Sequence, residues 1–109
     1  MYLDARRKDP NVFLFPESAV NFLGYQRIQA GKTREAIEIL KINELAYPRS
    51  ANVYDSLGDA YLADQQNELA LQYSERALKV LAENPQGNAG DMQGIRQSAE
   101  DKIHRLKPQ

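Results

Sequence analysis

Few side chains in this sequence have a type and spacing that could catalyse a reaction. His104 is the only histidine, and it stands beside Arg105 near the end of the chain. A nucleophilic triad needs a histidine held between a nucleophile and an orienting acid, so we expect His104 to be a solvated surface residue. Asp55 and Asp59 are four residues apart, which places both carboxylates on one face of a helix. They could act as an acid–base pair, but we expect a polar groove wall or a solvated face.

No pattern for a phosphate, a cofactor or a metal ion is present in the sequence. The glycines between Gly87 and Gly94 follow no predicted strand and lack the lysine of a phosphate-binding loop. The chain has no cysteine, which excludes disulfides and thiolate metal sites, and calcium-loop spacing is absent. We therefore expect no catalytic residue, no cofactor and no metal site, and a chain that is not an enzyme.

The composition is that of one globular domain without a strong overall charge. Of the 109 residues, 42% are hydrophobic and 27% are charged, which are ordinary values for such a domain. The formal net charge of −1 provides no field that would favour nucleic acid. No apolar run approaches the ~20 residues that span a bilayer. We therefore expect a partner that is neither nucleic acid nor a membrane.

One pattern occurs twice in the middle of the chain. Leu23-Gly24 is followed by Ala36, and Leu57-Gly58 is followed by Ala70 at the same spacing. The copies are related by a 34-residue period, which is typical of arrays of helical hairpins. Because small residues let two helices cross closely, we expect Gly24 and Gly58 to face a partner helix, with the large Tyr54 and Tyr61 filling the space beside them.

The elements that this pattern predicts are all helices, so the predicted fold class is all-α. Capping and helix-breaking residues place helices at about 17–30, 33–47, 51–64 and 67–83, with Thr33, Ser50 and Asn67 as N-caps. In the first helix, five residues fall at helical spacing on one face: Ala19, Val20, Leu23, Gly24 and Arg27. A fifth helix, capped by Asp91, should dock through one stripe: Met92, Ile95, Ala99, Ile103 and Leu106. The boundaries are an N-terminal arm at 1–16, repeats at 17–50 and 51–84, a linker at 85–90 and a capping helix at 91–109.

These residues resemble the tetratricopeptide repeat (TPR) family over 17–84. The better match is the second copy, which has the family's residues at six positions: Tyr54, Leu57, Gly58, Tyr61, Ala70 and Ala77. The copies depart from the family at Val20, Arg27 and Ser74, where aromatic residues are usual, and at Gln65, which replaces the glycine found at Gly31. The resemblance implies a short right-handed superhelix of two helix-turn-helix repeats. A chain this short is marginal, because about three repeats are usually needed for stability, so the fifth helix is expected to cap the second repeat.

A narrower resemblance concerns the segments 15–25 and 47–61. Both look like the paired repeats found as C-terminal tails of bacterial serine hydrolases of the beta-lactamase-like and esterase types. This resemblance implies that the chain is a structural or oligomerisation appendage whose catalytic residues would lie upstream.

The TPR resemblance also implies a binding surface on the first helix of each repeat. By that analogy a concave groove would be lined by eight residues: Asn21, Tyr25, Ile28, Gln29, Asn52, Asp55, Asp59 and Leu62. The chaperone-binding members of the family clamp a carboxylate with lysine and asparagine, whereas this chain has Asn21 and Tyr25 at those positions, and acids at Asp55 and Asp59. A basic or neutral ligand therefore fits better than a carboxylate. The alternative is that these residues form a plain solvent face.

Two segments remain to be explained. Val12 to Phe15 is a run of four apolar residues, which is either an arm packed on the first helix pair or a surface for another domain or a second copy of the chain. Asn43 lies among inward-facing positions and should bond a neighbouring loop. The leading hypothesis is a non-enzymatic protein–protein interaction module that binds a peptide or protein segment, with a possible homodimer through the arm.

Overall fold

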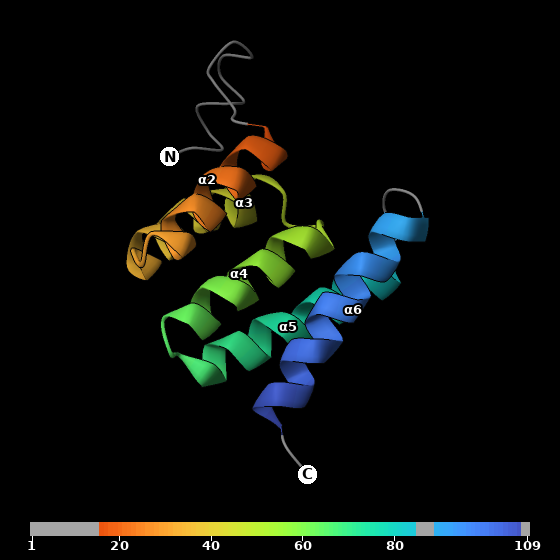
Figure 1. Cartoon of the computed structure of the whole chain (residues 1–109). Coiled ribbons are helices and arrows are strands. Elements are labelled where there is room, and N and C mark those ends of the chain that lie inside the picture. Colours follow the sequence, from red (N-terminus) through yellow and green to blue (C-terminus); the bar gives the residue numbers. More distant parts are fainter. Residues whose placement is uncertain (1–15, 85–88, 108–109) are drawn as a thin grey trace.

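The computed structural model describes residues 16–84 and 89–107, and almost all of them are helical (Figure 1). The helices are α2 (Glu17–Gln29), α3 (Thr33–Ala46), α4 (Ala51–Ala63), α5 (Asn67–Glu83) and α6 (Ala89–Leu106). The described residues contain no strand, so the predicted all-α class is confirmed. The arm with its run at Val12 to Phe15 lies outside the described residues, as do 85–88 of the predicted linker.

Helix α4 is the central element of the molecule. It packs against α5, with which it forms a hairpin, and also against α2, α3 and α6. Its sequence has buried residues on every side, among them Val53, Tyr54, Leu57 and Tyr61. Helices α2 and α3 form the first hairpin, and α6 lies along α5 and α4 at the other end (Figure 1).

The core has two parts, one on each side of α4. The first joins Ala36, Ile37 and Leu40 of α3 to Val53, Leu57 and Tyr61 of α4. The second joins Ala51 and Tyr54 of α4 to α5 and α6, and includes the fully buried Ala77 and Ala99. Met92 and Ile95 pack against this second part and Leu106 against the first, so most of the predicted α6 stripe contacts the core.

The two glycines of the repeated pattern face equivalent residues. A Cβ atom on Gly24 would lie 2.5 Å from Cδ2 of Leu40, and one on Gly58 would lie 2.9 Å from Oγ of Ser74. Leu40 and Ser74 are themselves related by the period of the repeat. The glycines therefore stand where the two helices of each hairpin cross most closely, as their spacing predicts.

The turns inside the two hairpins are built alike. Gly31 has φ +81°, and Gln65, its counterpart in the second hairpin, has φ +64°. The following amides donate to the carbonyls of Arg27 and Tyr61, 2.8 Å and 2.9 Å away, which is the six-residue bond of a Schellman cap. Gln65 thus adopts a left-handed conformation that glycine tolerates better.

Of the predicted N-caps, only Ser50 stands at the N-cap position of its helix. Ser50 precedes α4, but its hydroxyl donates to Oε2 of Glu17, 2.6 Å away, and makes no capping bond. Thr33 is the first residue of α3 and donates to Oδ1 of Asp64, 2.5 Å away. Both hydroxyls thus join one hairpin to the other. Asn67 and Asp91 lie inside their helices, since α5 begins at Asn67 and α6 already at Ala89.

The predicted inner face of α2 was only partly correct. Val20 and Gly24 are buried, but Ala19 and Leu23 are exposed because no described helix covers that side of α2. Asn43 is buried as expected, and its Nδ2 donates to the carbonyl of Glu17, 3.0 Å away. Its partner is therefore the first residue of α2 and not a loop.

Candidate functional site

The eight residues of the predicted groove lie on α2 and α4, which run side by side. Two hydrogen bonds join these helices. The hydroxyl of Tyr25 donates to the carboxylate of Asp59, and the hydroxyl of Ser56 donates to Oδ1 of Asn21. Two of the side chains expected to receive a ligand, Tyr25 and Asn21, are therefore bonded within the chain.

The two acids of the predicted groove have a cation of their own. Nζ of Lys102, on α6, donates to Oδ1 of Asp55 and to Oδ1 of Asp59, both 2.8 Å away, and to Oγ of Ser98 at 2.9 Å. The side chains of Lys102 and Asp55 are 4% and 7% exposed. Asp55 is thus not a solvated residue, because a buried ion pair occupies its carboxylate.

Lys102 reaches these acids through a gap that the second hairpin leaves beside α4. Where the first hairpin has the large Leu40 against Gly24, the second has the small Ser74 against Gly58. Cε of Lys102 lies 3.1 Å from the position that a Cβ on Gly58 would occupy. The alkyl chain of the lysine therefore fills the volume that a leucine fills in the first hairpin.

The surroundings shift the acidities of these groups. Burial, followed by the charge of Asp59 and the hydrogen bond to it, raises the pKa of Tyr25 well above its ordinary value. Burial also raises the pKa of Asp55, although the hydrogen bond and the charge of Lys102 oppose the shift. The site therefore favours the neutral phenol of Tyr25, and at Asp55 the cost of burying the carboxylate outweighs its pairing with Lys102.

The remaining predicted groove residues differ in what they offer a ligand. Ile28 and Leu62 are half-buried and pack against the first part of the core. Gln29 is exposed at the end of α2, and Asn52 is half-buried on the first turn of α4. The structure thus brings Tyr25, Asp55 and Asp59 into one network and leaves Asn52 apart from it.

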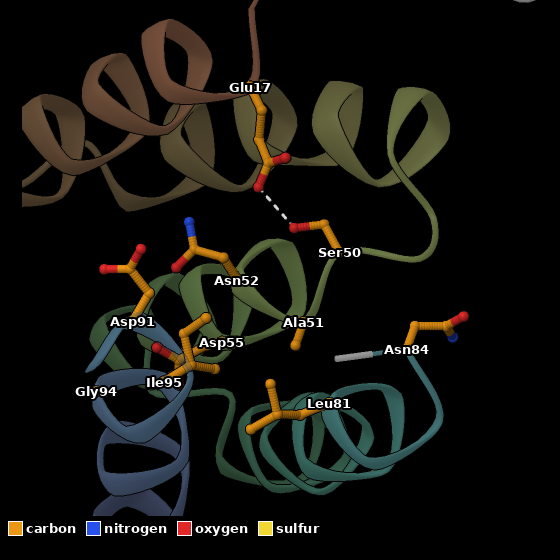
Figure 2. Close-up of a pocket in the computed structure, with 10 residues that line it drawn as sticks. All are labelled: Glu17, Ser50, Ala51, Asn52, Asp55, Leu81, Asn84, Asp91, Gly94 and Ile95. Atoms are coloured by element: carbon orange, nitrogen blue, oxygen red, sulfur yellow. Dashed lines mark hydrogen bonds between the residues drawn. The ribbon is translucent and has the colours of Figure 1, made fainter. Parts of the chain in front are cut away.

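A pocket of about 510 Å³ opens beside Asn52, between four helices (Figure 2). Its lining combines carboxylates and amides with a small apolar floor, and comprises Glu17, Ser50, Ala51, Asn52, Asp55, Leu81, Asn84, Asp91, Gly94 and Ile95. Ligand pockets in proteins usually measure about 300–1,000 Å³. Of the eight predicted groove residues, this pocket contains Asn52 and Asp55.

Sequence reasoning missed Lys102 and Ser98, although a signal for the lysine was present. Lys102 lies three residues after Ala99 and four before Leu106, so it falls on the stripe that was predicted to dock. A charged residue within a docking stripe needs a buried partner of opposite charge. The two acids at Asp55 and Asp59, also four residues apart, were candidates for that partner.

Other chemistry finds little support in the described residues. His104 is exposed on α6, as expected. Within 16–84 and 89–107 no three histidine, cysteine or acidic residues are grouped as metal ligands would be. None of the described helices is both long and apolar enough to span a membrane. No protein-family model matches the chain, and no curated protein matches it.

Proposed function

We propose that this chain is a non-enzymatic interaction module of the tetratricopeptide type, which binds a segment of another protein. Contacts that recur at the 34-residue spacing support this assignment: Gly24 with Leu40 and Gly58 with Ser74, and the two turns at Gly31 and Gln65. The bond from Tyr25 to Asp59 itself joins residues 34 apart. Such recurrence is what two stacked copies of one hairpin produce.

The observation that carries the binding proposal is the pocket beside Asn52. It lies where the N-terminal ends of α2, α4 and α6 converge, and besides Asp55, which is paired with Lys102, two carboxylates contribute to its lining: Glu17 and Asp91. A lining rich in acceptors suits a donor-rich group, such as a lysine or arginine side chain of an extended peptide. The pocket has the size for one or two side chains and not for a whole peptide.

The acids of the predicted groove are then not the main contacts of the ligand. Lys102 already provides the cation for Asp55 and Asp59, so a basic ligand would gain little from these acids further along α4. We therefore place the ligand's charged side chain at the pocket, with Asn52 positioned to hydrogen-bond its backbone.

The test is an NMR titration of the isotopically labelled chain with two peptides of equal length, one lysine-rich and one glutamate-rich. We expect the lysine-rich peptide alone to shift the side-chain amide signals of Asn52 and Asn84. Asn52→Leu should weaken this binding by about tenfold, the loss expected for one good hydrogen bond.

Two further variants localise the effect. Gln29→Leu changes an exposed residue at the far end of the predicted groove, and Gln72→Leu changes an exposed residue on α5. Neither residue lines the pocket, so both variants should bind the lysine-rich peptide as tightly as the parent chain. The proposal is contradicted if the lysine-rich peptide shifts neither amide signal, or if it binds Asn52→Leu as tightly as the parent chain.

A further inference from the structure

The large apolar side chains that remain exposed in the described part of the chain all lie on the first hairpin. They are Phe22 (63% exposed) and Leu23 (41%) on α2, and Ile42 (36%) and Leu45 (54%) on α3. Helix α2 thus has apolar residues on both sides, since Val20 and Gly24 face α3. A helix with this distribution is normally covered on both sides.

The internal repeat shows what this surface corresponds to in the second hairpin. The counterparts of Phe22 and Leu23, one period later, are Ser56 and Leu57, which are 1% and 0% exposed. They are covered because α2 and α3 pack on α4. The side of α2 and α3 that carries Phe22, Leu23 and Ile39 is therefore the same surface, which no described helix covers, and we call it the open face. Ile42 and Leu45 lie outside it, because their counterparts Arg76 and Lys79 are exposed.

The open face differs from its counterpart in polarity, which restricts what can cover it. Among the polar residues of the second hairpin that bond the first are Ser56, which bonds Asn21, Asp64, which bonds Thr33, and Tyr73, which bonds Glu44. The corresponding residues of the open face are Phe22, Ala30 and Ile39, whose side chains form no hydrogen bonds. Another hairpin of the same kind, stacked in sequence, would leave its own polar groups unsatisfied there.

A head-to-tail stack of whole chains does not fit either. The opposite end of the molecule is α6, and the exposed residues of that helix are mainly polar or charged: Asp91, Gln93, Gly94, Arg96, Gln97, Glu100, Asp101, His104 and Arg105. The surface described in this chain with matching apolar character is the open face itself.

We propose that two copies of the chain associate through their open faces around a two-fold axis. Phe22 and Leu23 of one copy would pack against the open face of the other, with Ile39 completing the contact. A two-fold contact needs a surface that complements itself, and an apolar patch packed against its own copy meets this condition. The net charge of −1 opposes association only weakly. This inference concerns a surface away from the pocket and does not rest on the proposed function.

Sedimentation equilibrium of the full chain, over a roughly hundredfold range of concentration, tests the proposal. We expect a monomer–dimer equilibrium, and a monomer for the double variant Phe22→Ser/Leu23→Gln, whose changes affect exposed side chains and leave the helical circular dichroism intact. The matched control, Gln93→Ser/Glu100→Gln on α6, should dimerise like the parent chain.

The absence of cysteine allows the contact to be mapped directly. A single cysteine at Gln26, which continues the outer stripe of α2, should give a cross-linked dimer with a short bismaleimide, and one at Glu100 should not. A chain that stays monomeric throughout overturns the proposal. So does a dimer that persists in the double variant, because the contact then lies elsewhere, for example in residues 12–15.

Discussion

Lys102 carries a positive charge into a closely packed region between α4, α5 and α6. Its side chain is 4% exposed, and its ammonium is bonded to Asp55, Asp59 and Ser98. Removing one partner of such a buried pair costs more than the pair contributes, because the remaining charge is left without compensation. The lysine thus ties the position of α6 to the two acids of α4.

We predict that Lys102→Met lowers the free energy of unfolding by about 3–5 kcal/mol, measured by urea denaturation. Lys107→Met is the matched control, because the pair of Lys107 with Glu75 is 57% and 45% exposed and should contribute at most about 1 kcal/mol. Adding Asp55→Asn to Lys102→Met should restore part of the loss. Equal effects of the two lysine variants would contradict this account.

Tyr25 should make the fold sensitive to alkali. Burial and Asp59 raise the pKa of Tyr25 in the folded chain above its ordinary value of 10.0, so the folded state holds this proton more tightly than the unfolded state. The stability that Tyr25 contributes is therefore complete below about pH 10 and is lost as the pH rises above that value. Unfolding free energies measured from pH 9 to 12 should fall less steeply for Tyr25→Phe than for the parent chain. Parallel curves would show that the tyrosine is not linked in this way.

At the scale of the helices, Gly24 marks a point where α2 and α3 pack closely against each other. A methyl group on Gly24 would lie 2.5 Å from Leu40, which is 1% exposed and cannot turn away. Gly24→Ala should therefore destabilise the chain by about 1–3 kcal/mol, the usual cost of overpacking. Gly94→Ala is the contrasting variant, because nothing lies within 4 Å of its Cβ position on α6; helix propensity should then add up to about 1 kcal/mol. Thermal denaturation of both variants measures the difference, and a shared sign would refute the crossing argument.

The sequence predicts the hairpins well because their constraints are local and periodic. Gly24, Gly58 and the turn at Gly31 recur at a fixed spacing, so the helices and their crossing points follow from counting. The contact between Lys102 and Asp59 joins residues 43 apart, whereas Tyr25 and Asp59 are 34 apart. The position of α6 along its own axis therefore does not follow the 34-residue period of the two hairpins. The spacing of residues in the sequence could not predict that Lys102 lies beside the two acids.

The same limitation explains the error on α2. Leu23 and Leu57 stand at the same position of the pattern, yet they are 41% and 0% exposed. A periodic pattern describes the inside of an array and carries no sign of where the array ends. The hydroxyls of Thr33 and Ser50 were misassigned for a related reason, since a side chain that can cap its own helix can also bond a neighbouring one.

At the scale of the whole molecule, stability depends on α6. Without it the second part of the core loses Ala99 and Ile95, and Asp55 loses Lys102. Because two hairpins alone are below the usual minimum for a stable array, a chain ending at Asn84 should lose its cooperative unfolding transition in urea. Among the described contacts, a chain ending at Leu106 lacks the exposed pair with Glu75 and the terminal backbone bond from Lys107 to Ile103, and it should unfold like the parent. Cooperative unfolding of the shorter chain would contradict this view.

The small residues beside Lys102 also have an evolutionary consequence. If α6 were shifted along its axis by one turn, Ser98 or Leu106 would take the place of the lysine, and both carboxylates would lose their cation together. Only one axial position of α6 therefore satisfies the two acids. Positions 55, 58, 59, 74 and 102 should therefore be inherited as a set. Descendants of this sequence that lost the lysine are expected to have gained bulk at 58 or 74 and to have shed the acids at 55 and 59.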